Sequence, residues 1–208
     1  MPLIRKPGKD ERKLQTDPAA VLRALTQGNR DERWSAARAA AGIAGGLDAL
    51  AAALPDEADP RVREAMFTSI ARIGTAQSVA ALIPLLRYDD ARMRTGALDA
   101  LRAMPEAVRA YLPALLQDDD SDVRLLSCDI ARGLPADAAT SILSTLLATE
   151  TEANVCAAAI EVLAEVGGPS ALPALEACAA RFAESSFLTF AIRIARERIL
   201  AQSLGSHV

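Results

Sequence analysis

Apolar and small residues recur at helical spacing along the chain, and the clearest such stretch covers residues 59–74. Asp59 is a good helix cap, Pro60 suits a first position that needs no N–H, and Gly74 suits a helix end. The residues that fall on one face by the 3.6-residue period are Val62, Ala65, Met66, Ser69, Ile70 and Ile73. The pattern predicts an amphipathic helix with a defined start and stop.

The same unit returns along most of the sequence. An arginine that follows the first apolar position marks four copies, at Arg33, Arg63, Arg94 and Arg124, with spacings of 30, 31 and 30 residues. Cys156 stands in the fifth copy of that position, 32 residues further on. Each copy continues into a break with glycine or proline and then into a leucine-rich stretch. Acidic turns separate the copies.

Repetition at this period predicts the architecture. One helix pair cannot bury its own apolar stripes, so consecutive pairs must stack to form a continuous core. We therefore predict an all-α fold, an α-solenoid of about five stacked antiparallel helix pairs with single-helix caps and no sheet. The expected repeats cover about residues 29–57, 58–88, 89–117, 118–150 and 151–185, and the caps cover 17–28 and 186–202. Together they would form one domain over residues 17–202.

The two chain ends lack this periodicity. Residues 1–16 contain five basic residues, two acidic residues and two prolines, and are expected to form a flexible tail. An alternative is that this arm becomes ordered on a partner. Residues 203–208 are expected to form a second flexible tail.

The amino-acid composition narrows the range of folds, partners and cellular compartments that we expect. Apolar residues make up 51% of the 208 residues and aromatics only 3%, which favours closely packed helices over strands. The net charge of −4 argues against a nucleic-acid partner. No apolar run reaches the roughly 18 residues of a membrane helix, so no membrane association is expected. Three cysteines without metal spacing fit a reducing compartment, and we expect a cytoplasmic location.

Segments 59–63 (Asp-Pro-Arg-Val-Arg) and 120–124 (Asp-Ser-Asp-Val-Arg), each followed by a break and a leucine-rich helix, resemble HEAT repeats. The likeness is to the short bacterial kind first recognised in phycobilin lyases, and it covers about residues 29–185. The resemblance implies that turn aspartates and arginines pair along the stack as a ladder. The residues in these roles are Asp59, Asp90, Asp122, Arg33, Arg63, Arg94 and Arg124. Cys156 departs from the pattern, so the ladder is expected to stop before the fifth copy.

Catalytic chemistry finds little support in the sequence. The single histidine, His207, lies in the predicted C-terminal tail, which argues against histidine triads and histidine metal clusters. The acidic run of residues 118–122 lacks the glycine and closing glutamate of a calcium loop. Cys128 and Cys156 are expected to be small core residues rather than nucleophiles. We predict no enzyme, no metal site and no cofactor.

The leading hypothesis is an adaptor that binds another protein through its surface. In HEAT-like stacks the second helices line the concave face, so outward residues there are the contact candidates. They are Gln77, Arg87, Tyr88, Arg109, Tyr111 and Gln117. Tyr111 could equally fill the seam beside Leu112. Trp34, the only tryptophan, either packs on the first cap or anchors a ligand.

Two other functions are considered. The resemblance implies an alternative function as a bilin lyase or chromophore-handling factor. A HEAT-like DNA glycosylase would need a basic groove, which the acidic composition disfavours.

The last predicted helix carries a surplus of apolar residues. On a helical wheel they span about 200°, more than one neighbouring helix pair can cover. The expected surplus stripe is Leu188, Ile192 and Ile199. Either other parts of the same chain cover this stripe, and the protein is a monomer, or a second copy covers it, and the protein is a homodimer through this helix.

Overall fold

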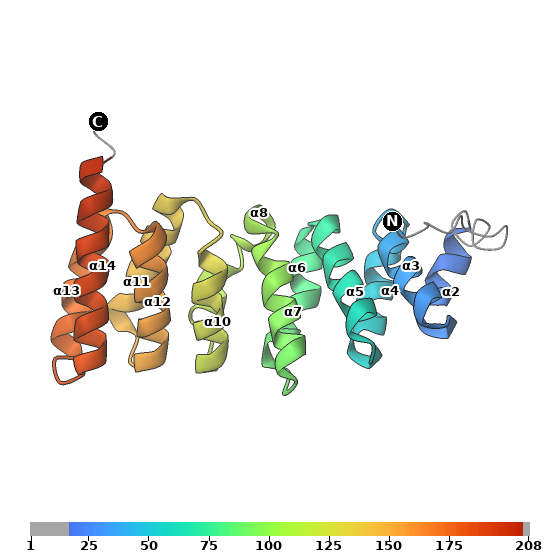
Figure 1. Cartoon of the computed structure of the whole chain (residues 1–208), viewed down its shortest axis with the longest axis horizontal. Coiled ribbons are helices and arrows are strands. Elements are labelled where there is room, and N and C mark those ends of the chain that lie inside the picture. Colours follow the sequence, from blue (N-terminus) through green and yellow to red (C-terminus); the bar gives the residue numbers. More distant parts are fainter. Residues whose placement is uncertain (1–16, 206–208) are drawn as a thin grey trace, which may run out of the picture. The chain divides into compact units, whose positions relative to one another are not determined.

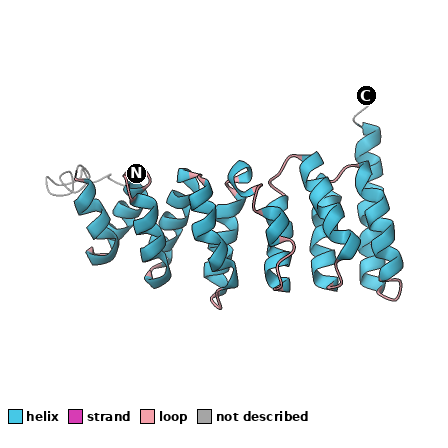
Figure 2. Cartoon of the chain, turned by 180° about the vertical axis from the view of Figure 1, so that it is seen from behind, coloured by secondary structure: helices cyan, strands magenta, loops and turns pink. Residues whose placement is uncertain are grey.

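The computed structural model describes residues 17–205, and every regular element in this range is helical (Figures 1 and 2). This confirms the predicted all-α fold: the described range holds 13 α-helices, three short 3-10 helices and no strand. It divides into two compact units, the first ending at Leu85 and the second beginning at Leu86. The division falls close to the predicted junction of the second and third repeats, within what was expected to be one repeat domain.

The first unit consists of a capping helix followed by two helix pairs. Its helices are α2 (Pro18–Gln27), α3 (Arg30–Ala40), α4 (Gly46–Ala53), η1 (Leu54–Asp56), α5 (Pro60–Ile73) and α6 (Ala76–Leu82). Helix α3 packs between α2 and α5, and α4 packs against α5 and α6. First helices therefore stack on first helices, as the repeat pattern predicts.

The second unit continues the same arrangement. Beyond η2 (Ile83–Arg87) its helices are α7 (Ala91–Arg102), α8 (Pro105–Val108), α9 (Leu112–Leu115), α10 (Ser121–Ala131), α11 (Ala136–Thr149), α12 (Ala153–Val166), η3 (Pro169–Ala171), α13 (Leu172–Arg181) and α14 (Ser186–Gly205). Helix α10 packs on α7 and α12, α12 packs on α14, and α11 packs on α13. Each unit has the helix-pair stacking of an α-solenoid.

The second helix of the third repeat is broken. Two four-residue helices, α8 and α9, replace it, and each has a proline at its start. Pro113 has no N–H to donate to the preceding turn, which interrupts a continuous helix between Val108 and Leu112.

Helix starts follow the capping signals of the sequence. The Asp59 carboxylate accepts hydrogen bonds from the backbone N–H groups of Arg61 (2.9 Å) and Val62 (3.2 Å). Gly74 ends α5 in the left-handed conformation, with φ of 65°. A side chain at this φ would be strained, which explains the glycine.

Two arginines tie consecutive repeats together through glutamates. Arg33 Nε donates to Glu57 Oε2 (2.7 Å) and its Nη2 to Oε1 (3.0 Å). Arg124 binds Glu150 in the same two-pronged way, at 2.7 and 3.1 Å. Both glutamates are almost fully buried, at 5% and 6% exposure. Each pair therefore links the start of one repeat to the turn that begins the next.

The aspartates predicted for the ladder have other roles. Asp59 and Asp90 cap α5 and α7, and Glu57 rather than Asp59 holds Arg33. Asp120, not Asp122, caps α10, and none of the described residues pairs with the Asp122 side chain. The predicted role is therefore wrong for Asp59 and Asp122, because the Asp59 carboxylate is bound to its own helix and Glu57 holds Arg33.

The four marker arginines do share one contact. Each guanidinium donates to a backbone carbonyl five or six residues upstream, in the turn before its own helix. The acceptors are Gly28 for Arg33, Glu57 for Arg63, Tyr88 and Asp89 for Arg94, and Asp118 and Asp119 for Arg124.

Cys156 keeps the backbone part of this contact. Its thiol donates to the carbonyl of Glu150, six residues upstream, at 3.7 Å. It brings no charge to the next turn. Arg181 of α13 instead donates to the carbonyls of Leu147 and Ala148, at the end of α11.

The chain itself covers the apolar stripe of the last helix. Leu188, Ile192 and Ile199 are buried on the side of α14 that packs on α12 and α13, whereas Phe187 and Phe190 are 63% and 56% exposed. Of the two covers expected for this stripe, the structure shows the chain itself. Helix α14 also continues to Gly205, so the expected tail is helical over residues 203–205. The remaining tail residues, 206–208, and the predicted tail 1–16 lie outside the described range.

Removing the Glu150 charge should destabilise the protein. Burial raises the pKa of Glu150, but hydrogen bonds from Arg124 and from the Glu152 backbone outweigh burial and lower it. We expect Glu150→Gln to reduce the free energy of unfolding by about 2–3 kcal/mol at pH 7 in urea melts. The matched control is Glu161→Gln, because Glu161 is exposed and makes only a long contact with Arg132 (3.5 Å). Its cost should stay below about 0.5 kcal/mol.

The same variant has a predictable pH dependence. A lowered pKa stabilises the folded state above the unfolded value, about 4.3, and this stabilisation is lost as the pH falls through the folded value. The difference between wild type and Glu150→Gln should therefore shrink below about pH 4. A difference that stayed constant down to pH 2 would contradict the role of this carboxylate.

The orientation of α14 can be checked with two truncations. Ile192→Ala removes a side chain that is 2% exposed and should cost about 2–4 kcal/mol of unfolding free energy. Phe190→Ala removes a larger but mostly exposed ring and should cost less than about 1 kcal/mol. Chemical denaturation followed by circular dichroism measures both, and the opposite ranking would contradict the buried position of Ile192.

Candidate functional site

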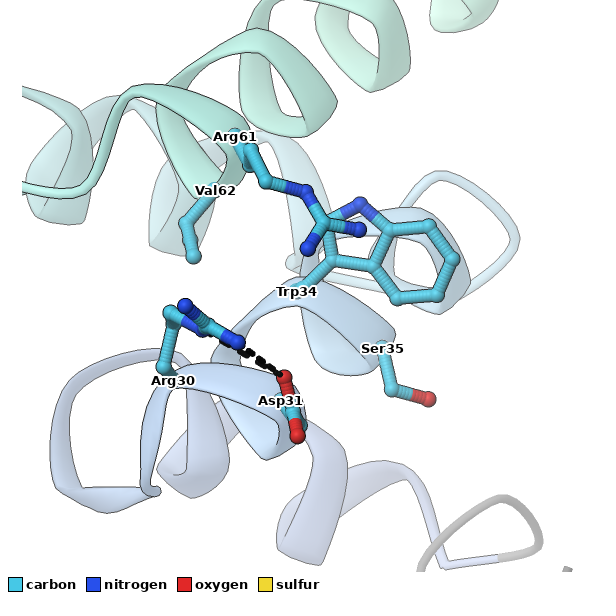
Figure 3. A pocket seen from close by; sticks show the side chains of 6 residues that line it. All are labelled: Arg30, Asp31, Trp34, Ser35, Arg61 and Val62. Carbon is cyan, nitrogen blue, oxygen red and sulfur yellow. Dashed lines mark hydrogen bonds and ion pairs between the residues drawn. The ribbon is translucent and has the colours of Figure 1, made fainter.

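An open pocket lies between the N-terminal parts of α3 and α5 in the first unit. It has a volume of about 230 Å³ and is lined by Arg30, Asp31, Trp34, Ser35, Arg61 and Val62 (Figure 3). These six residues define what we call the Trp34 groove. Arg30 and Trp34 are four residues apart, so both stand on the same face of α3.

Local sequence signals fix the two helix starts that form the groove. Asn29 accepts from the N–H groups of Asp31 and Glu32, and the Glu32 carboxylate accepts from the Asn29 N–H (2.7 Å). This capping box sets where α3 begins, as Asp59 does for α5. Val62 is fully buried and gives the groove an apolar base. The lining side chains thus stand on two rigid helices that pack against each other.

Trp34 is half-buried and stacked with an arginine. The guanidinium carbon of Arg38 lies 4.7 Å from the centre of the Trp34 ring, within cation–π range. Arg72 of α5 in turn donates to the Arg38 backbone carbonyl. In Figure 3 the Arg61 side chain reaches from α5 toward the indole. The exposed part of the indole is therefore an apolar surface with guanidinium groups beside it.

The charge around the groove is positive. Arg30 and Arg61 line it, Arg38 stacks on Trp34, and the acidic residues nearby are Asp31 in the lining and the exposed Glu64 beside Arg61 on α5. Asp31 contacts Arg30 at 3.4 Å in an exposed pair. The chain as a whole carries a net charge of −4, so this region has the opposite sign to the protein.

The predicted second-helix contact residues fall in both units. Gln77 is exposed on α6 in the first unit, and the other five lie in the second unit. Tyr88 is 36% exposed, Arg109 and Gln117 are exposed, and Tyr111 is half-buried. Arg87 forms an ion pair with Asp118, which brings it to the turn that follows Gln117. Five of the six are surface residues, but no described pocket joins them to one another.

The cysteines are core residues, as expected for Cys128 and Cys156. All three are free and buried. Burial raises the pKa of Cys128 to about 12, so this thiol stays protonated. The thiols of Cys156 and Cys178 interact between α12 and α13, which lowers the pKa of Cys178 and raises that of Cys156. The contact joins the two helices inside the core.

Residues 17–205 contain neither a metal-binding cluster nor a membrane-spanning helix. No group of three or more His, Cys, Asp or Glu side chains there is placed to hold a metal ion. No helix in that range is both long and apolar enough to cross a membrane. His207 lies outside it.

Sequence reasoning singled out Trp34 but missed the arginines around it. The spacing of Arg30, Trp34 and Arg38 at i, i+4 and i+8 was a usable signal, because it places all three on one helix face. Arg61 comes from another helix, and only the packing of α3 on α5 shows that it joins the same surface.

The comparisons with known proteins agree on the fold. A family model described as HEAT repeats matches residues 18–102 and 108–185. Similar solved structures include an archaeal HEAT-like repeats protein from Thermococcus onnurineus NA1 (14% identity, TM-score 0.51, covering 95% of this chain and 98% of that one). TOG3 of Drosophila melanogaster Mini spindles also matches (17% identity, TM-score 0.53, covering 88% and 94%).

Another similar structure is the complex of CpcE and CpcF of phycocyanin lyase from Nostoc sp. PCC7120. It has 17% identity and a TM-score of 0.40, and the match covers 96% of this chain and 98% of that one. Among curated proteins, no sequence relative was found.

The positive charge at the groove can be measured through its tryptophan. Trp34 is the only tryptophan, so its fluorescence reports this site alone. Because arginines attract anions and repel cations, the iodide-to-caesium quenching ratio should exceed that of free tryptophan by about twofold or more at low salt. Arg61→Gln should reduce this excess. In denaturant the ratio should be close to that of free tryptophan, and the same ratio in the folded protein would contradict the positive site.

Proposed function

Since the chain belongs to the HEAT-repeat family, we propose that it is a non-catalytic adaptor that binds another protein through the Trp34 groove. The observation that carries the proposal is the groove itself: a partly exposed indole, stacked with Arg38, on two helices that pack together. Tryptophan and arginine are the side chains that most often dominate binding energy at protein interfaces.

The described residues supply surface rather than reactive groups. All three cysteines are buried, and the most buried carboxylates, Glu57 and Glu150, are bound to arginines. These pairs hold repeats together, and the one carboxylate in the groove lining, Asp31, is exposed and contacts Arg30. A location in the cytoplasm fits three free cysteines in a chain of this length.

The proposal can be tested by affinity capture from native cells. Wild type, Trp34→Ala and Tyr88→Ala would be compared, with bound proteins quantified by mass spectrometry. We expect wild type and Tyr88→Ala to retain the same stoichiometric partner and Trp34→Ala to lose it by about tenfold or more, because truncating a central aromatic anchor is costly.

Tyr88→Ala is the matched control because it removes an exposed aromatic side chain from the other unit. Equal recovery with Trp34→Ala would contradict the groove as the contact surface. Loss with Tyr88→Ala alone would assign the contact to the second-helix residues instead.

A further inference from the structure

We infer that the Trp34 groove binds an extended acidic peptide segment of the partner, with carboxylates on Arg30 and Arg61 and one apolar side chain against Trp34. The inference rests on the proposed function and adds to it the chemistry of the ligand. Three properties of the groove carry it: its charge, its size and its weak internal pairing.

The charge selects an anionic ligand. Arg30 and Arg61 approach the pocket from two different helices, and Arg38 adds a third guanidinium beside Trp34 on α3. A guanidinium presents N–H donors in a planar fork that matches a carboxylate. Two such forks on opposite walls suit a segment that carries acidic residues on both sides of an apolar one.

The size selects a single side chain. The volume of about 230 Å³ is below the 300–1,000 Å³ of typical small-molecule sites. Val62 forms an apolar base, and the Trp34 indole supplies an apolar wall. A leucine or phenylalanine side chain fits this space, while the backbone of a peptide can continue along the open side.

The existing ion pair is easily replaced. Arg30 and Asp31 are adjacent in the sequence, meet at 3.4 Å, and are 57% and 84% exposed. Exposed pairs of this kind contribute about 1 kcal/mol or less. A ligand carboxylate can therefore take over the Arg30 guanidinium without breaking a structural contact.

Two other occupants are disfavoured by charge. Residues 1–16 carry five basic and two acidic residues, so the same positive surface would repel this segment. A second copy that placed the same groove on its symmetry mate would bring two positive surfaces together. Charge complementarity therefore favours an acidic segment of another protein over both of these occupants.

The test is a direct titration of the full-length protein with defined peptides. The probe is a fluorescein-labelled, end-blocked dodecapeptide of Glu, Asp and Leu, and the matched peptide has Gln and Asn in place of the acids. Anisotropy and Trp34 emission would be recorded together. We expect the acidic peptide to bind saturably and to change the Trp34 emission. The affinity for the amide peptide should be lower by at least about tenfold.

Three variants localise the charge effect. Arg30→Gln and Arg61→Gln should each lower the affinity for the acidic peptide by about three- to tenfold. Arg92→Gln is the matched control and should leave affinity unchanged. Arg92 is exposed at the second position of α7, the place that Arg61 occupies in α5, but no tryptophan accompanies it. Thermal melts would show that all three variants remain folded.

Several results would overturn the inference. They are equal affinity for the acidic and amide peptides, an unchanged affinity in Arg30→Gln and Arg61→Gln, or tighter binding of a single-stranded oligonucleotide of the same charge. If the peptide fails while Trp34→Ala still loses the captured partner, the adaptor function stands and only the ligand chemistry is wrong. If the peptide binds while Trp34→Ala captures the partner normally, the groove binds acidic segments but not that partner.

Discussion

The pairing of Arg33 with Glu57 and of Arg124 with Glu150 is the constraint on which the stacking of repeats depends. A carboxylate buried to this extent is costly unless a counter-charge and hydrogen bonds accompany it. The arginine supplies the charge, and nearby backbone N–H groups supply the rest, at 2.8 Å from Asp59 to Glu57 and 2.9 Å from Glu152 to Glu150. One guanidinium thus holds two successive turns, its own through carbonyls and the next through a carboxylate.

Much of this fold follows from the sequence because capping and periodicity are local. The Asp-Pro start of α5 and its Gly74 end need no information beyond the helix itself. The ladder partner was missed because two acids compete within three residues of one turn. Asp59 has a short side chain that reaches its own helix N–H groups, whereas the longer Glu57 extends to Arg33. The length of each side chain decides which acid caps the helix and which acid pairs with the arginine. The repeat pattern alone does not give this assignment.

The last helix shows the limit of the helical wheel. When apolar residues span about 200°, periodicity does not decide which half faces the core. Residues 188, 192, 195 and 199 form a narrow seam of Leu, Ile, Ala and Ile, all buried, and α12 beside them is rich in alanine. Small and branched side chains allow close helix packing, so this seam turns inward. The bulkier Phe190 stays outside, where Arg193 lies 5.1 Å from its ring centre.

Stability and recognition are separated within a single five-residue motif. In Asp59-Pro60-Arg61-Val62-Arg63, Asp59 caps the helix, Val62 is buried, and Arg63 donates to the carbonyl of Glu57. Arg61, two residues before Arg63, lies on the other side of the helix and lines the Trp34 groove. The equivalent position in α7 is also arginine, yet Trp34 has no counterpart in a chain with one tryptophan. The proposed binding surface therefore lies where one repeat adds an aromatic side chain to an outward position that the fold itself leaves open. The residues of the groove can then vary without disturbing the contacts that hold the repeats together.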